Sequence, residues 1–316
     1  MEDSKMEIKP RKVAIIGTGL VGATCGYALI NQGICEELLL IDLNIEKAKG
    51  EMFDLVNSTE FMPYRTRVRV ATYQECGDVD VIIFTAGAAP KGNQTRLDTL
   101  GVSATICQSV IEEVMDSGFN GFFVIASNPV DIISYHIWKL SGLPKNRVIG
   151  TGTSIDTARL KNILSTKLND IDSRQILAYV LGEHGDSQMI PWSIVSVAGI
   201  PLLEYAKEAL DLDAIAYQTV QAGWDIYKQK GATYYGISAA VVGIIKSIFH
   251  DEQTIIPTST LLDGEYEEWE VYTGVPTIIG KNGIESIIQV PMTEVELKSF
   301  KHSNNILREY IKTIGY

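Results

Sequence analysis

The feature that most constrains the fold is a glycine-rich turn near the amino end, Gly17-Thr18-Gly19-Leu20-Val21-Gly22. It follows an apolar run at 13–16 and opens a segment with helical spacing of apolar residues at 21–33. In such a strand–turn–helix unit the first glycine permits a tight turn. The second lets the backbone approach a pyrophosphate, and the third lets the helix pack on the strand. The pattern therefore predicts a dinucleotide-binding unit.

An acidic residue strengthens this prediction. Asp42 ends the next apolar run, at 37–42, twenty residues after Gly22. A carboxylate there accepts hydrogen bonds from both ribose hydroxyls and repels a 2′-phosphate, while the helix N-terminus supplies N–H groups to the phosphates. Because no Arg or Lys follows before Lys47, the pattern favours NAD over NADP. The alternative is that the glycines serve only tight packing and that Asp42 caps the following helix.

The first half of the chain alternates strands with helices. Further apolar runs at 67–71, 79–85, 122–126 and 148–149 alternate with helical patterns at 45–57, 103–117 and 131–141. Nearly continuous Val, Ile and Leu is typical of strands that are buried on both faces of a parallel sheet. This order predicts an α/β protein with a Rossmann-type, doubly wound parallel sheet.

The second half has a different pattern. Helices are expected near 156–168, 213–230, 236–249 and 293–313, and a hairpin signal, Asn282-Gly283, separates two strands at 277–280 and 284–290. We therefore expect an NAD-binding domain at 1–150 and an α+β substrate domain at 151–316. Because no Pro- or Ser-rich linker lies between them, the halves should pack closely.

Composition excludes several partners. The net charge of −12 argues against nucleic acid and anionic membranes, and it requires a local cationic site for any anionic substrate. The four scattered cysteines contain no CxxC pair, which predicts buried thiols in a reducing compartment and no metal site. The polar N-terminus lacks the apolar segment of a signal peptide, so we expect a cytoplasmic protein. These cysteines are Cys25, Cys35, Cys76 and Cys107.

The candidate chemistry lies in Gly182-Glu183-His184-Gly185-Asp186-Ser187, which follows Asp156-Thr157-Ala158-Arg159 by 26 residues. Flanking glycines let a ligand approach the histidine closely, and imidazole exchanges a proton near neutral pH. Asp156 and Arg159 share a helical face, and a guanidinium suits bidentate capture of a carboxylate. Taken alone, the spacing of Asp156 and Arg159 more often belongs to an ordinary surface ion pair, and the alternative for His184 is a loop histidine with a structural role.

Together, these motifs resemble the NAD-dependent lactate/malate dehydrogenase family over nearly the whole chain, and its lactate branch more than its malate branch. The matching segments, in chain order, are Ile16-Gly17-Thr18-Gly19, Leu40-Ile41-Asp42, Thr85-Ala86-Gly87-Ala88, Thr95-Arg96-Leu97-Asp98, Ser127-Asn128-Pro129-Val130-Asp131, Gly150-Thr151-Gly152-Thr153, Asp156-Thr157-Ala158-Arg159, Gly182-Glu183-His184-Gly185-Asp186-Ser187 and Lys230-Gly231-Ala232-Thr233.

The resemblance implies a role for each matching residue. His184 would donate a proton to a 2-keto acid, Asp156 would orient the imidazole, and Arg159 would bind the substrate carboxylate. Arg96, on a mobile lid, would polarise the carbonyl. Asn128 would contact substrate and nicotinamide, and Thr233 would line the substrate pocket. The resemblance also implies a homo-oligomer, with a tetramer favoured, and cofactor contacts at Gly17, Gly19, Leu20, Val21, Gly22, Asp42, Thr85, Ala86, Gly87 and Asn128.

One position departs from the family pattern. Pro90 stands where lactate enzymes usually carry Gln and malate enzymes Arg, and no Arg lies between Gly87 and Thr95. A second substrate carboxylate would lack a partner, so we expect an L-2-hydroxyacid dehydrogenase of lactate type acting on pyruvate. The alternative is an L-2-hydroxyisocaproate-type enzyme that accepts bulkier aliphatic 2-keto acids. Malate dehydrogenase is less favoured.

The sequence also bears on two other classes of function and on one regulatory property. The chain could be a non-catalytic NAD-binding protein, or a related glycosidase that uses NAD and a metal. The complete set of candidate catalytic residues argues against the first, and the lack of a suitable Cys–His pair argues against the second. Many bacterial lactate dehydrogenases are activated by fructose 1,6-bisphosphate through an Arg and a His. Lys161 and Leu177 occupy the matching positions, which predicts little activation.

Overall fold

The computed structural model describes residues 9–88 and 99–316. Six parallel strands form the amino-terminal part of its main sheet, in the order β6-β5-β4-β1-β2-β3. Each of the six predicted apolar runs forms one of these strands, so the doubly wound parallel sheet is confirmed. The strands are β1 (Lys12–Ile16), β2 (Glu37–Ile41), β3 (Arg67–Val70), β4 (Val81–Phe84), β5 (Phe122–Ile125) and β6 (Val148–Gly150).

The same sheet continues into the second half of the chain. Three antiparallel strands, β10 (Thr254–Asp263), β11 (Trp269–Gly280) and β12 (Gly283–Ile287), extend it past β6, where Ser259 pairs with Gly150. The predicted turn at Asn282-Gly283 joins β11 to β12. The pattern did not predict β10 or the first part of β11, because each strand contains a proline, which usually marks an edge or a break. In the structure Pro257 and Pro276 face each other.

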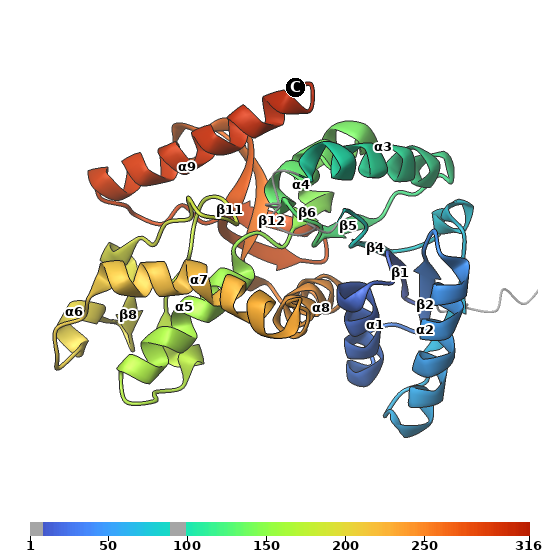
Figure 1. Cartoon of the computed structure of the whole chain (residues 1–316), viewed down its shortest axis with the longest axis horizontal. Coiled ribbons are helices and arrows are strands. Elements are labelled where there is room, and N and C mark those ends of the chain that lie inside the picture. Colours follow the sequence, from blue (N-terminus) through green and yellow to red (C-terminus); the bar gives the residue numbers. More distant parts are fainter. Residues whose placement is uncertain (1–8, 89–98) are drawn as a thin grey trace, which may run out of the picture.

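Helices cover both faces of the sheet (Figure 1). The helices α1 (Leu20–Gln32) and α8 (Tyr235–His250) share one hydrophobic core with Val13 and Ile15. On the opposite face, α3 (Leu100–Asp116), α4 (Val130–Ser141) and α9 (Glu294–Thr313) share a second core with Ala14 and Ile16. Successive strand residues point to opposite faces. Burial on both faces explains why these strands read as unbroken apolar runs.

A smaller third core lies at the far end of the molecule from α2 (Ile45–Ser58), as Figure 1 shows. It includes Leu160, Leu164 and Ile215, which come from α5 (Ser154–Lys167) and α7 (Leu212–Lys230). The remaining elements of this region are α6 (Leu202–Tyr205), β7 (Ile176–Leu177), β8 (Ser196–Val197) and β9 (Ile200–Pro201). Short 3-10 helices occur at Thr59–Phe61, Tyr73–Cys76, Lys145–Arg147, Ser173–Gln175, Trp192–Ile194 and Glu265–Glu267.

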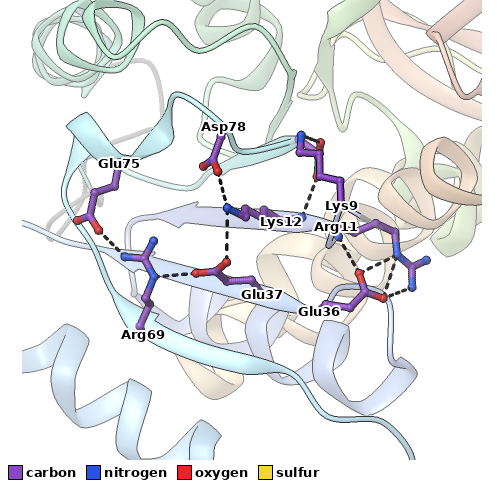
Figure 2. A network of polar contacts seen from close by, with 9 residues as sticks. Lys9, Arg11, Lys12, Glu36, Glu37, Arg69, Glu75 and Asp78 are labelled. Atoms are coloured by element: carbon purple, nitrogen blue, oxygen red, sulfur yellow. Dashed lines mark hydrogen bonds and ion pairs between the residues drawn. The ribbon is translucent and has the colours of Figure 1, made fainter. Parts of the chain in front are cut away.

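Charged side chains gather where the parallel strands begin (Figure 2). Lys12 on β1 pairs with Asp78 and lies 3.7 Å from Glu37 on β2, which in turn accepts a 2.8 Å hydrogen bond from Arg69 on β3. Arg69 also pairs with Glu75. Cations and anions therefore alternate across this edge of the sheet.

The prediction of buried thiols is confirmed, because all four cysteines are buried and free. Burial raises the pKa of the Cys25 thiol to about 11 and that of Cys35 to about 12. Both thiols are therefore protonated at neutral pH and act as small apolar groups. Within residues 9–88 and 99–316, no helix is both long and apolar enough to cross a membrane.

The amino end of α9 provides a test of local stability. Thr293 and Glu296 form a reciprocal capping box, in which the Thr293 N–H donates to Glu296 Oε2 over 2.8 Å and the Glu296 N–H donates to Thr293 Oγ1 over 3.3 Å. Replacing Thr293 with Ala removes one of these bonds, so we expect the free energy of unfolding to fall by about 1 kcal/mol. Urea denaturation followed by far-UV circular dichroism measures this.

Ser299→Ala, on the same helix, is the matched control. The exposed Ser299 hydroxyl donates only to the carbonyl of Val295 within the helix. We expect its loss to change stability by less than about 0.5 kcal/mol. Equal effects of the two substitutions would show that the capping box does not stabilise α9.

Candidate active site

The glycine-rich turn lies between the end of β1 and the start of α1. Gly17 has φ +96°, and a Cβ atom there would lie 2.8 Å from the backbone nitrogen of Ala86. At Gly22 a Cβ atom would lie only 2.0 Å from the carbonyl oxygen of Gly17. Apart from its chain neighbours, no described residue has a heavy atom within 4 Å of a Cβ atom placed on Gly19, which precedes α1 as its N-cap. The turn is therefore tight beneath the helix and open above it, as a pyrophosphate requires.

Asp42 holds this turn from the end of β2. Its Oδ2 accepts hydrogen bonds from the Thr18 N–H (2.7 Å) and hydroxyl (2.9 Å), and its Oδ1 accepts from the Asn44 N–H (2.9 Å). Partial burial pushes the pKa of Asp42 upward, but the hydrogen bonds from Asn44 and Thr18 outweigh it, so the pKa lies below its usual value. The carboxylate is thus ionised at neutral pH, and the charge that should repel a 2′-phosphate is present.

A buried carboxylate joins the two candidate catalytic cations. Asp156 is 2 % exposed; its Oδ2 lies 2.5 Å from His184 Nδ1, and its Oδ1 accepts a 2.9 Å hydrogen bond from Arg159 Nη1. The side chains of Arg159 and His184 are 11 % and 10 % exposed. The pair predicted from the i, i+3 spacing on α5 is therefore an internal one and not a surface ion pair. The same carboxylate also orients the imidazole.

Two adjoining cavities meet at this cluster. The smaller, of about 60 Å³, brings Asn128 and Thr233 together with Arg159, His184 and Val21. It joins residues from the dinucleotide turn, the end of β5, α5, the histidine loop and the segment before α8. The Asn128 Oδ1 atom is buried without a hydrogen-bond partner among the described residues. It is thus an acceptor that a ligand's donor can satisfy.

The larger cavity, of about 140 Å³, adds a wall that the sequence did not indicate. Val220, Gly223 and Trp224 reach it from α7. Their spacing of one helical turn is the only signal in the sequence, and such a stripe is equally typical of a core-facing helix. A Cβ atom on Gly223 would lie 3.0 Å from Arg159 Nη1, so this glycine gives the guanidinium its room.

Other predicted residues lie near the same cleft or outside the described ranges. Thr85 Oγ1 donates to the carbonyl of Gly17 over 2.7 Å, which ties the end of β4 to the glycine-rich turn. Ala86 and Gly87 follow Thr85, and Leu20 begins α1 with a 59 % exposed side chain. Pro90 and Arg96 fall within residues 89–98, outside the described residues.

Comparison with known proteins identifies the family of this chain. Residues 11–150 match the family model of the lactate/malate dehydrogenase NAD binding domain, and residues 153–315 match that of its alpha/beta C-terminal domain. The chain belongs to the lactate/malate dehydrogenase family. Its amino-terminal half is accordingly the family's NAD-binding domain, and the predicted NAD cofactor is confirmed.

Individual relatives lie on the lactate side of the lactate/malate dehydrogenase family. L-lactate dehydrogenase 3 of Bacillus thuringiensis subsp. konkukian is 55 % identical over 98 % of this chain and 100 % of that protein. L-lactate dehydrogenase of Lactococcus lactis subsp. cremoris is 43 % identical over 98 % of this chain and 100 % of that protein. The ligand-bound crystal structure of minor L-lactate dehydrogenase from Enterococcus mundtii is 44 % identical, with a TM-score of 0.92 over 96 % of this chain and 98 % of that one. These relatives do not favour the hydroxyisocaproate alternative.

The geometry at Gly17 predicts weaker cofactor binding for Gly17→Ala. An alanine at φ +96° is strained, and its methyl group would press on the Ala86 backbone, so the turn must shift. We expect the dissociation constant for NADH to rise about tenfold or more, which corresponds to about 1.4 kcal/mol. Titration of NADH fluorescence measures it.

Gly50→Ala is the matched control for Gly17→Ala. Gly50 lies within α2, and outside the backbone of that helix a Cβ atom there would have no neighbour within 4 Å among residues 9–88 and 99–316. NADH affinity should be unchanged, while the helix gains slightly in stability. If Gly17→Ala bound NADH as tightly as Gly50→Ala, the turn would not be the pyrophosphate site.

Proposed function

We propose that this protein catalyses reversible hydride transfer between NADH and pyruvate, the activity of an L-lactate dehydrogenase. The observation that carries the proposal is the buried arrangement of His184, Asp156 and Arg159 in a cavity wall shared with Asn128 and Thr233. A proton donor and a carboxylate-binding cation thus lie within one small space. Val21, from the glycine-rich turn, lines the same space and connects it to the NAD-binding part of the chain.

Reduction of a 2-keto acid requires a hydride at C2 and a proton at the ketone oxygen. Bound NADH supplies the hydride. The chain supplies the proton from His184, whose protonated ring is stabilised by the negative charge of Asp156 at 2.5 Å. In the reverse direction the neutral imidazole takes the proton of the hydroxyl group. Asp156 keeps its bond to Nδ1, so it fixes the ring orientation in both directions.

Arg159 is proposed to bind the substrate carboxylate. Its Nη1 donates to Asp156, while its Nε is buried and has no hydrogen-bond partner among the described residues. A buried donor without a partner is costly, and a carboxylate ligand would satisfy it. Asn128 is proposed to contact both substrate and nicotinamide. The predicted role of Arg96, to polarise the ketone, remains a proposal that rests on the family resemblance.

The larger cavity also indicates which substrate charge it can accept. Besides Asp156, two carboxylates, Glu183 and Asp186, line it. A second carboxylate on the substrate would face these anions, and like charges in a confined site repel each other. Together with Pro90, this supports a monocarboxylate such as pyruvate over oxaloacetate.

We also propose a homo-oligomer, with a tetramer favoured, and a cytoplasmic location. Exposed apolar side chains on and near α2 support the first. Tyr27 on α1 is 49 % exposed, Phe61 beyond α2 is 87 % exposed, and Ile45, Phe53 and Val56 on α2 are 56, 62 and 42 % exposed. Large apolar side chains left exposed on one helix are typical of a face that a second copy covers. The four free, buried thiols support a reducing compartment.

A substrate panel tests the proposed activity. NADH oxidation, followed by absorbance, should give the highest kcat/KM with pyruvate among pyruvate, 2-ketobutyrate, 2-ketoisocaproate, phenylpyruvate and oxaloacetate. Oxaloacetate should be the poorest of the small substrates because its second carboxylate would face Glu183 and Asp186, which line the cavity. A maximum at oxaloacetate would contradict the proposal, and a maximum at 2-ketoisocaproate would show that the pocket is selective for branched side chains.

Two controls accompany the panel. His184→Asn should abolish turnover and leave NADH binding intact, which separates catalysis from cofactor binding. Fructose 1,6-bisphosphate should leave the KM for pyruvate essentially unchanged, because Lys161 is half-buried and Leu177 offers no donor. A large fall in KM on its addition would contradict this expectation.

The apolar surface on α2 predicts the effect of a charge there. Phe53→Asp should lower the molar mass in solution, measured by light scattering after size-exclusion chromatography, because a carboxylate cannot be buried unpaired in an interface. Val295→Asp, at the exposed start of α9, is the control and should leave the mass unchanged. An unchanged mass for both variants would show that this surface is not an interface.

A further inference from the structure

A second buried carboxylate, Asp131, contacts the backbone of the histidine loop, whereas Asp156 contacts the histidine ring. It lies in the first turn of α4, three residues after Asn128, and is 2 % exposed. Its Oδ2 accepts a 2.8 Å hydrogen bond from the backbone N–H of His184. Its Oδ1 accepts a 2.6 Å hydrogen bond from the hydroxyl of Ser259 on β10.

The backbone of the histidine loop depends on such contacts. Leu181 pairs with Met189 across the loop, and Gly182 pairs with Gly274 on β11. Beyond Gly182 the chain leaves the strand, and its next N–H group, that of Glu183, donates to the Ser303 hydroxyl on α9 over 2.9 Å. The N–H of His184 donates to Asp131. Each successive residue is thus fixed by a different element, and at the histidine itself the partner is an anion.

We propose that Asp131 is a positioning residue for His184, whose carboxylate fixes the histidine backbone while Asp156 fixes the ring. The inference rests on the proposed role of His184 as proton donor. With backbone and ring held at separate points, the imidazole retains one orientation toward the substrate cavity. A buried, charged acceptor is stronger than a neutral one, and a carboxylate accepts from both donors, whereas an amide would accept from only one of them and donate to the other partner.

The negative charge of Asp131 supports this role in addition to its hydrogen bonds. Burial raises the pKa of Asp131 to about 6, while the Ser259 hydroxyl, the His184 backbone and the charge of His184 act in the opposite direction. The hydrogen bonds from the His184 N–H and the Ser259 hydroxyl favour the ionised carboxylate, and a negative charge beside His184 favours the protonated imidazole. The other charged groups that line the cavity around His184, among the described residues, are Asp156 and Arg159 from α5 and Glu183 and Asp186 from its own loop.

Asp131→Asn tests the charge with little change of shape. The amide can still accept from the His184 N–H while it donates to the Ser259 hydroxyl. We expect kcat for pyruvate reduction to fall about tenfold and the alkaline decline of the rate to begin at lower pH, with NADH affinity unchanged. Asp131→Ala removes the acceptor too, and we expect a fall of about a hundredfold in kcat. A kcat that is higher in Asp131→Asn than in Asp131→Ala would show that the acceptor at this position helps to position His184.

Ser134→Ala is the control on the same helix. The Ser134 hydroxyl is buried near Asp131 in sequence and has no hydrogen-bond partner among the described residues. This variant should keep the kcat and the pH profile of the unaltered protein. The inference would be wrong if Asp131→Asn also kept the kcat and the pH profile of the unaltered protein and Asp131→Ala only lowered the stability. Asp131 would then have a structural role alone.

A readout without turnover separates this inference from the proposed function. The chain has four histidines, so the ring signals of His184 can be followed by NMR and assigned with His184→Asn. The titration midpoint of His184 should move to lower pH in Asp131→Asn and stay in place in Ser134→Ala. An inactive unaltered protein that shows this shift would overturn the proposed function alone. If the unaltered protein is active, but Asp131→Asn shows neither the shift of the His184 midpoint nor the fall in kcat, only the role of Asp131 is overturned.

Discussion

The bidentate use of one buried carboxylate underlies the whole site. Asp156 holds the ring of His184 and the guanidinium of Arg159, with contacts of 2.5 and 2.9 Å. Burying two cationic groups and one anion is costly unless each is paired and well oriented. The chain meets this condition by placing Asp156 and Arg159 one turn apart on α5 and by bringing the histidine in on a separate loop. Substrate recognition and proton transfer are thereby coupled through a single side chain.

The main sheet supplies the frame that this arrangement needs. Because β10 and β11 continue the sheet beyond β6, Gly274 and Ser259 lie at the histidine loop, where Gly274 pairs with Gly182 and Ser259 holds Asp131. The half of the chain with the candidate catalytic residues is therefore built onto the NAD-binding sheet. Rigid strands place groups more accurately than free loops do, which suits a reaction that needs near-contact geometry.

Sequence patterns predicted what local physics determines. The six parallel strands follow from apolar runs, and the glycine-rich turn follows from its position between strand and helix. The convergence of His184, Asp156 and Arg159 was expected only because the family resemblance joined segments that spacing alone leaves apart. The strand β10 was missed because Pro257 usually interrupts a ladder, and it is tolerated here opposite Pro276. The α7 wall was missed because helical spacing does not reveal what a helix faces.

Departures from local preference mark the site. Gly223 lies inside α7, where glycine is about 1 kcal/mol less favourable than alanine, yet a methyl group there would lie 3.0–3.2 Å from three atoms of the Arg159 guanidinium. Gly17 adopts φ +96°, which alanine avoids, beneath the proposed pyrophosphate site. Asp131 is an acid where burial disfavours its charge. In each case a residue that is unfavourable locally is explained by the neighbour it accommodates: a guanidinium, a backbone turn or a histidine N–H. The fold thus gives up local stability at the points where the chemistry requires close approach.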